Sequence, residues 1–339
     1  MVRAALMLLL LSGCGREPGP AAPAPRPAAS SAPIGPVVVY DGREGTVMRS
    51  LLDVYQMQTR TIVELATAND PDSQARADLV ILGSLAELQA AAEADAFRPV
   101  YDDTVAARIP DPLRDAESRW TTLSVRPRPV FYDPGQVSAA EAATVTDYSD
   151  LGTDTWRSRL CLSSSKVPGN RVLVASLIDR FGVRDAEIRV RNWVANLATL
   201  PYETDAQLIA AVADGACAIG IADGGDLQRF AAAHQGQQLQ TIEFAAPGSM
   251  VIDISGAGVA RHAKHPDGAV RLLKWLTESS FNSMFAAQTH EYPANSDAAP
   301  DGMRPGAEIG DRIAALAPLS ELGFRLEDAA LLVERAHYP

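Results

Sequence analysis

Short apolar segments alternate with amphipathic helical segments along the chain. In the first third, strands are predicted at residues 37–40, 61–65 and 78–82, and helices at 46–58 and 85–94. Strands that alternate with helices form a parallel sheet with right-handed crossovers. The pattern therefore predicts an α/β protein in which the loops after Tyr40 and Leu82 lie at the same edge of a sheet.

The rest of the chain continues this alternation and predicts a second α/β lobe. Further strands are predicted at residues 120–125, 129–132, 159–162, 217–221, 240–244 and 249–255, and helices at 171–180, 186–197, 204–215, 266–278, 279–288 and within the tail 310–336. Gly256-Ala-Gly258 is predicted to be a turn. The chain is expected to cross between the lobes more than once. The predicted first lobe comprises residues 36–128 and 249–300, and the second comprises residues 129–248 and 301–339.

One strand-turn-helix segment is the first candidate for a ligand site. The apolar run Cys217–Ile221 predicts a buried strand, Asp223-Gly-Gly-Asp226 predicts a turn, and a helix follows from Leu227. In α/β proteins such a turn faces the ligand, because the amides of the helix N-terminus point into the crevice. Two interpretations of Asp223 and Asp226 are possible. Both are ligands, or Asp223 only caps the helix and Asp226 only complements the helix dipole.

The N-terminus carries a targeting signal. Basic Arg3 and the apolar run 4–11, too short to span a bilayer, precede Leu11-Ser-Gly-Cys14. This is the pattern of a bacterial lipoprotein signal peptide, residues 1–14, in which Cys14 is acylated. Residues 15–35 are rich in Pro, Ala and Ser and predict an extended tether. A periplasmic protein anchored to a membrane only by its lipid is therefore expected, with the choice of inner or outer membrane open.

The two cysteines beyond Cys14 predict a disulfide. The chain has three cysteines, and Cys161 and Cys217 both lie in apolar strand-like runs. An even pair in an oxidising compartment favours a bond between them, the alternative being two buried free thiols.

Charge and motifs exclude several function classes. The net charge of −12 argues against a nucleic-acid-binding protein, since phosphate binding requires a basic surface. The five histidines are scattered without metal-ligand spacing. Ser163-Ser-Ser-Lys166 matches the S-x-x-K pattern of serine hydrolases, but the accompanying elements are missing. An enzyme is therefore the minority reading.

The segments taken together resemble the ferric-iron class of extracellular solute-binding proteins, which serve ATP-binding-cassette (ABC) importers. The resemblance covers residues 36–339 and is carried, in order, by Val38–Glu44, Ala77–Ile81, Leu160–Lys166, Val174–Leu177, Trp193–Leu197, Cys217–Ala222, Ile254–Val259 and Glu291–Asn295. It implies a type II periplasmic-binding-protein fold, with two lobes, a ligand cleft and hinge strands near 125–132 and 244–254. It also implies a monomer that works with an ABC permease.

The resemblance also implies where the ligand binds. The family holds Fe³⁺ with a Tyr-Tyr pair that falls here on Gly225 and Asp226, so both phenolates are missing. Another family ligand falls on Glu44, and a glutamate of some members falls on Gly83. The family's synergistic-anion loop corresponds to Ser163–Asn170. The candidate ligand-binding residues are Asp41, Arg43, Glu44, Ser163, Ser164, Ser165, Lys166, Asn170, Tyr202, Asp223, Gly225 and Asp226.

These residues leave the ligand open. Glu44, Asp223 and Asp226 form a candidate metal set, for Fe³⁺ or equally for a divalent cation, and no other cofactor is implied. The alternative is that the site, having lost the tyrosines, is rebuilt for a non-metal anion or an organic solute. The sequence thus predicts a lipid-anchored solute-binding protein with an altered ligand site. The alternative from another class is an envelope lipoprotein that uses the same fold as a sensor or adaptor.

Overall fold

The structure is a computed structural model, and it describes residues 35–43, 47–67, 72–244, 246, 249–295, 297–298 and 319–339. The predicted signal peptide, Cys14, most of the tether and Glu44 lie outside these residues. Among the described residues, no helix combines the length and the apolar character that crossing a membrane requires.

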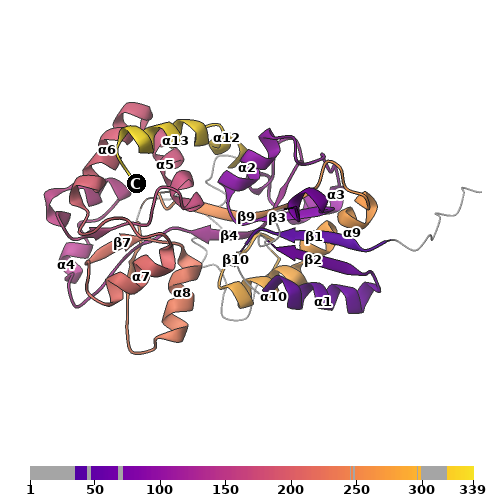
Figure 1. The fold of residues 1–339 in the computed structure, drawn as a ribbon. Helices are drawn as coiled ribbons and strands as arrows, with labels where there is room; N and C mark the ends of the chain where they lie inside the picture. Colours follow the sequence, from indigo (N-terminus) through magenta and orange to yellow (C-terminus); the bar gives the residue numbers. More distant parts are fainter. Residues whose placement is uncertain are drawn as a thin grey trace, which may run out of the picture. The chain divides into compact units, whose positions relative to one another are not determined.

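A six-stranded mixed sheet forms the core of the first lobe, in the order β10-β4-β9-β3-β1-β2 (Figure 1). Its strands are β1 (Val37–Asp41), β2 (Val63–Thr67), β3 (Leu79–Leu82), β4 (Thr121–Pro127), β9 (Ile252–Val259) and β10 (Tyr292–Pro293). Strand β1 pairs in parallel with β2 and with β3, which confirms the predicted parallel unit. Strand β9 returns antiparallel between β3 and β4.

Helices cover both faces of this sheet because its strands are apolar on both sides. Every residue of β3 is buried, as is every residue of β9. One face shares a core with α1 (Val47–Thr59), α9 (Pro266–Leu276) and α10 (Ser279–Thr289), whereas α2 (Leu85–Glu93) belongs to the other core.

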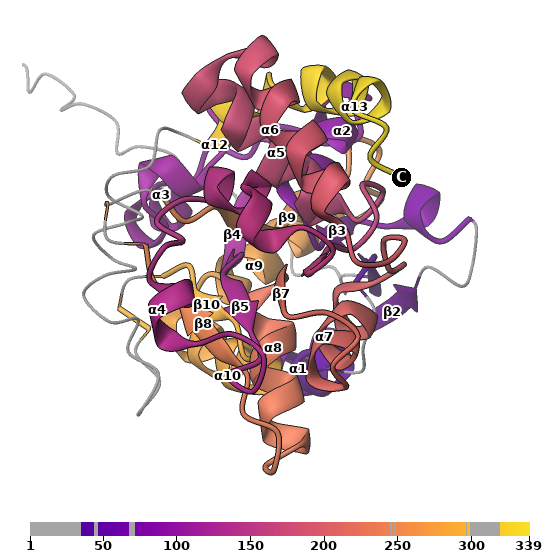
Figure 2. The same cartoon turned by 90° about the vertical axis from the view of Figure 1, so that its left-hand side faces the viewer.

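A four-stranded sheet forms the core of the second lobe, in the order β6-β7-β5-β8. Its strands are β5 (Val130–Tyr132), β6 (Leu160–Cys161), β7 (Ile219–Ile221) and β8 (Gln240–Ile242). Figures 1 and 2 show α5 (Pro168–Phe181), α6 (Val183–Asn196) and α13 (Leu326–Arg335) together on one side, and α7 (Asp205–Ala213) and α8 (Gly224–Ala233) on the other. The remaining helices are short: α3 (Asp103–Arg108), α4 (Ala139–Ala142), α12 (Leu319–Gly323) and the 3₁₀ turns Gln74–Arg76, Asp111–Leu113, Tyr148–Gly152 and Asp154–Trp156.

The chain passes between the sheets where β4 leads into β5 and where β8 leads toward β9. These crossings lie at the predicted hinge segments. The predicted residue boundaries of the two lobes stay a prediction.

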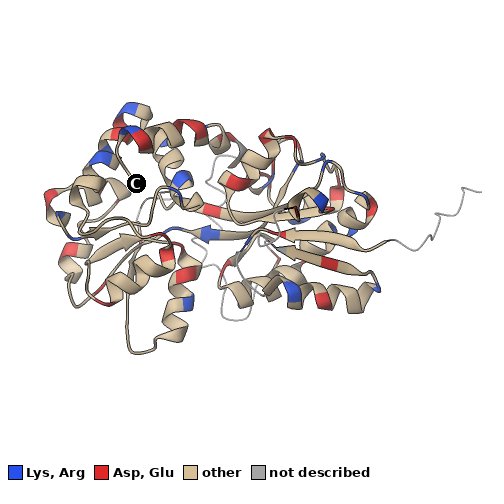
Figure 3. Cartoon of the chain, viewed as in Figure 1, with Lys and Arg blue, Asp and Glu red and all other residues tan. Residues whose placement is uncertain are grey.

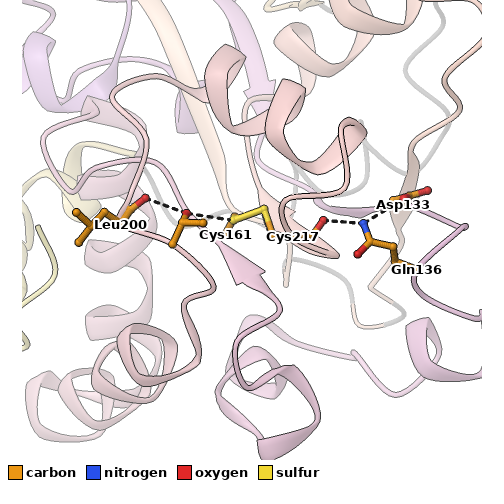
Figure 4. The surroundings of a disulfide bond; sticks show 6 residues. Asp133, Gln136, Cys161, Leu200 and Cys217 are labelled. Carbon is orange, nitrogen blue, oxygen red and sulfur yellow. Dashed lines mark hydrogen bonds between the residues drawn. A yellow bond between two sulfur atoms is a disulfide. The ribbon is translucent and has the colours of Figure 1, made fainter.

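The disulfide prediction is confirmed. Cys161, at the end of β6, is bonded to Cys217, two residues before β7, with the two Cα atoms 5.9 Å apart. Figure 4 shows that the carbonyl oxygen of Cys217 also accepts a 3.0 Å hydrogen bond from Nε2 of Gln136. The bond therefore joins two strands that are already parallel neighbours.

One predicted turn is wrong. Gly256-Ala-Gly258 continues β9 instead of ending it. Its glycines serve close packing: a Cβ atom on Gly256 would lie 2.8 Å from Cδ1 of Leu88, and one on Gly258 would lie 2.5 Å from Cδ1 of Phe97. Glycine inside a strand marks such close approaches as well as turns.

Candidate ligand-binding cleft

Two neighbouring cavities, here called the cleft, lie between the elements of the two sheets and share Gly83 and Arg126. The first cavity, of about 380 Å³, is lined by Asp41, Arg43, Val47, Met48, Gly83, Arg126, Arg229, Gln288, Thr289 and Glu291. The second, of about 370 Å³, is lined by Gly83, Ser84, Glu87, Arg126, Arg128, Lys166, Val167, Pro168, Gly169, Glu203, Thr204, Asp205, Asp223, Asp226 and Asp253. The loops after β1 and β3 meet at the first cavity, as the parallel pairing predicts.

Arg43 follows β1 and lines the first cavity. Its Nη1 atom donates a 3.1 Å hydrogen bond to Oγ of Ser255 and lies 3.5 Å from Oε2 of Glu291. The guanidinium carbon stands 4.4 Å from the centre of the Phe285 ring, a distance typical of a cation–π contact. These contacts hold the guanidinium group in place at the cavity wall.

Arg126 lies on β4 and borders both cavities. It donates to the carbonyl oxygen of Gly83 and, over 3.2 Å, to Oδ2 of Asp253, its register partner on β9. Figure 3 shows this basic stretch of β4 beside an acidic stretch of β9. Burial alone would lower the pKa of Arg126, but nearby Asp223 and Asp253 outweigh it and raise the pKa, so the group stays charged.

Arg128 and Asp205 form a buried ion pair in the wall of the second cavity. Their side chains are only 2% and 5% exposed, and Nη1 of Arg128 lies 3.0 Å from Oδ2 of Asp205. Nη2 of Arg128 also donates to Oδ1 of Asn170 over 2.7 Å. Burial would raise the pKa of Asp205, but Arg128 and a hydrogen bond from Ser163 lower it. The pair is therefore fully ionised within the protein.

Asp223 caps helix α8 and faces Arg126. Its Oδ1 atom accepts hydrogen bonds from the amides of Gly225 (2.9 Å) and Asp226 (3.3 Å). Its Oδ2 atom lies 3.5 Å from Nη1 of Arg126 and has no hydrogen-bond partner among the described residues. Asp223 is 4% exposed, and its burial raises its pKa to about 6 although Arg126 opposes the shift.

The predicted anion loop, Ser163–Asn170, donates several hydrogen bonds to acceptors within the protein. Oγ of Ser163 donates to Oδ1 of Asp205 over 2.5 Å, and Nδ2 of Asn170 donates to the Oγ and carbonyl oxygen of Ser163. The Ser165 amide and the Ser164 hydroxyl both donate to the carbonyl oxygen of Pro339. Since Ser163 is committed to Asp205, the structure gives no support to a Ser163–Lys166 catalytic pair.

The predicted site residues therefore divide into two groups. Asp41 and Arg43 line the first cavity, and Lys166, Asp223 and Asp226 line the second. The predicted residues that line neither cavity, within the described part of the chain, are Ser163, Ser164, Ser165, Asn170, Tyr202 and Gly225. Glu44 lies outside the described residues. The ligand role of all of them stays a prediction.

The candidate metal set is incomplete in the described residues. They contain no group of three His, Cys, Asp or Glu side chains arranged to hold a metal ion. Oδ1 of Asp223 is committed to its helix cap, and Asp226 forms an ion pair with Arg229. Because Glu44 is not described, the set Glu44, Asp223 and Asp226 also stays a prediction.

The sequence analysis missed several charged residues of the cleft. They are Arg126, Arg128, Asp205, Arg229, Asp253 and Glu291. The available signal was Arg126-Pro-Arg128, two basic residues in a segment that is otherwise strand-like. A charge placed in a strand that becomes buried needs a partner, and so marks a site.

The chain is similar in sequence to bacterial solute-binding proteins. A sequence model described as bacterial extracellular solute-binding protein matches residues 52–307. The chain is 28% identical over 233 residues to iron uptake protein A1 of Synechocystis sp., a match that covers 67% of this chain and 62% of that protein. It is 23% identical over 257 residues to the Fe(3+)-binding periplasmic protein of Serratia marcescens, covering 71% and 73%. The match to iron uptake protein A1 thus spans less than two thirds of that relative.

The fold is also that of solved structures. A Trichodesmium protein (IdiA, FutA), solved in complex with iron and citrate ligands, superposes with a TM-score of 0.79 at 24% identity, covering 90% of this chain and 100% of that chain. Such a likeness establishes the fold, which is the type II periplasmic-binding-protein fold that the sequence predicts.

Proposed function

Because this chain belongs to the family of bacterial extracellular solute-binding proteins, we propose that it captures a small anionic solute in its cleft and delivers it to an ABC importer. The family is one of binding proteins, and the chain is a binding protein and not an enzyme. The relatives named as periplasmic and as iron uptake proteins support an extracytoplasmic importer component.

The observation that carries the proposal is the arginine lining of the first cavity. Arg43, Arg126 and Arg229 share this cavity of about 380 Å³. Guanidinium groups present forked donors that match carboxylate and phosphate oxygens. Nε of Arg126 is buried without a hydrogen-bond partner in the described residues, whereas Nε of Arg43 faces Oδ1 of Asp41 at 3.6 Å. An orphaned donor is costly, and an anionic ligand would supply an acceptor beside Arg126.

The carboxylates of the first cavity are poorly placed to hold a bare cation. Oδ1 of Asp41 accepts the amide of Arg43, and Oε2 of Glu291 accepts the hydroxyls of Ser124 and Ser255. Each also lies near the guanidinium group of Arg43. A cation would have to displace these donors and approach the arginine charge. This favours a ligand that brings its own negative charge.

Iron remains compatible with this proposal when it arrives as an anionic chelate. Relatives of this chain are named for iron uptake, and the Trichodesmium protein was solved with iron and citrate. A ferric polycarboxylate would present carboxylate oxygens to the arginines without needing tyrosine ligands. The second candidate is direct coordination of a metal by Glu44, Asp223 and Asp226.

Replacing Arg43 by glutamine is expected to weaken binding of the anion by about tenfold or more, since a hydrogen bond to a charged group contributes about 1.5–3 kcal/mol. The measurement is calorimetric titration of the protein with sodium citrate, ferric citrate and sodium phosphate, with manganese chloride as the cation arm. Arg49→Gln, on the exposed side of α1, is the matched control and should leave the dissociation constant unchanged. Tight binding of Mn²⁺ alone, with no binding of any of the anions, would replace this proposal with the carboxylate metal site.

The lipid anchor belongs to the same proposal. The signal peptide pattern ending at Cys14 supports acylation of that residue, with residues 15–35 as a tether from the membrane. Intact-mass analysis of the protein extracted from membranes is expected to show Cys14 as an acylated N-terminus. A mature N-terminus elsewhere would contradict the anchor.

A further inference from the structure

Helix α8 of the second lobe reaches across the cleft to helix α10 of the first lobe. Nη1 of Arg229 donates a 2.6 Å hydrogen bond to the carbonyl oxygen of Thr289, the last residue of α10. The last carbonyls of a helix have no partner within the helix, and a cation is favourable there because of the helix dipole. The contact therefore uses a natural acceptor at the end of α10.

Asp226 fixes the same arginine from its own helix. It forms an ion pair with Nη2 of Arg229, three residues further along α8. The guanidinium group thus lies between a carboxylate of one lobe and a carbonyl of the other. The end of α10 is equally well defined, because His290 takes the left-handed conformation, with φ of 59°, and terminates the helix.

Gly225 permits the close approach of the two helices. A Cβ atom at this position would lie 3.4 Å from the carbonyl oxygen of His290 and 3.1 Å from Oδ1 of Asp223. A larger side chain would push the start of α8 away from His290. Gly225 and Asp226 are also the positions on which the family resemblance places the iron-binding tyrosines.

We propose that Gly225, Asp226 and Arg229 form, with Thr289 and His290, a clasp that holds the cleft closed through the protein's own atoms. The residues at the expected ligand positions, together with Arg229, then serve lobe closure, and the ligand is left to Arg43 and Arg126 of the first cavity. Every contact of the clasp is made within the chain, so closure by this route needs no bound solute. Binding would then proceed through transient opening of a mainly closed protein.

The test measures the distance between the lobes in the full chain. Spin labels are placed at Met57→Cys on α1 and Leu200→Cys in the second lobe, positions that are 75% and 83% exposed. Pulsed dipolar electron paramagnetic resonance without added solute then reports the distribution of lobe-to-lobe distances. The parent protein is expected to give one narrow population.

Arg229→Gln is expected to raise the ratio of open to closed molecules about tenfold, the change that corresponds to one charge-assisted hydrogen bond. Gly225→Leu should shift the distribution in the same direction, because its side chain extends beyond the Cβ position, which lies 3.4 Å from the carbonyl oxygen of His290. Arg229→Lys, which keeps the donor and the charge, should retain most of the closed population.

Arg157→Gln is the matched control and should leave the distances unchanged. It breaks an Arg–Asp pair of the same (i, i+3) spacing, Arg157 with Asp154, that bridges no cleft. The clasp is refuted if Arg229→Gln gives the parent distribution, or if the parent is already broadly open. Either result leaves the anion proposal standing, since that depends on solute binding and on Arg43.

Discussion

Replacement of Arg128 by methionine is expected to lower the free energy of unfolding by about 3–5 kcal/mol, the usual penalty for removing one partner of a buried ion pair. The Asp205 side chain, 5% exposed in the parent, would lose the guanidinium group that lies 3.0 Å from it. Among the described residues, the donors left to it would be the Ser163 hydroxyl and the amide of Asp223. Chemical denaturation followed by circular dichroism measures the loss.

The pH dependence of the same variant gives a second, independent readout. The pKa of Asp205 is lowered in the folded protein, so its contribution to stability is present above the pKa of an unfolded aspartate, about 4, and is lost as the pH falls. Without Arg128, burial is expected to raise the pKa of Asp205 in the folded protein. The ionised carboxylate then lowers the stability of the variant at neutral pH, and its protonation at lower pH removes that penalty. The difference in stability between parent and Arg128→Met should therefore be largest at neutral pH and shrink toward pH 4.

A second substitution separates the ion pair from simple loss of packing. In Arg128→Met with Asp205→Leu no buried charge is left alone, so the double variant should be more stable than Arg128→Met. Arg157→Met, at an exposed pair, should leave the unfolding midpoint where it is. A loss below about 1 kcal/mol for Arg128→Met would show that the pair contributes little.

Removal of the disulfide by Cys161→Ala with Cys217→Ala is expected to lower the free energy of unfolding by about 4 kcal/mol. The two cysteines are 56 residues apart, and breaking a loop of that length returns conformational entropy to the unfolded chain. Both residues lie in the apolar core shared with α7 and α8, so their replacement by alanine also removes packed sulfur. Urea denaturation of the parent and the double variant measures the difference.

The control for this prediction is the parent protein unfolded and refolded in a reductant. It keeps the cysteine side chains but loses the bond, and its stability should match that of the double variant to within the cost of the lost packing. If the reduced parent were as stable as the oxidised parent, the disulfide would have no role in stability.

Local patterns predicted much of the fold because local chemistry decides those features. The strand Val37–Asp41 and the helix start at Thr204, whose side chain accepts the amide of Gln207, follow from apolar spacing and capping. The pairing of Cys161 with Cys217 follows from compartment and number. The prediction of a turn at Gly256–Gly258 was wrong because a sequence does not distinguish a glycine in a turn from one packed against a side chain such as Leu88 or Phe97.

The cleft could not be predicted to the same depth, because its contacts join distant parts of the chain. Arg128 meets Asp205 across 77 residues, and Arg126 meets Asp253 across 127. Ser163–Asn170 looks rich in free donors, yet Asp205 and Pro339 accept several of them. A single sequence records which donors exist and does not record which acceptors the fold brings to them.

The disulfide-bonded strand before α8 and the start of α8 itself tolerate substitution to different degrees. Cys217–Ala222 is buried and bonded to β6, whereas Asp226, at the start of the next helix, is partly exposed, and its side chain forms an ion pair with Arg229. Substitution of Asp226 is therefore expected to change the contact between the lobes at Arg229 and to leave the disulfide-bonded strand in place.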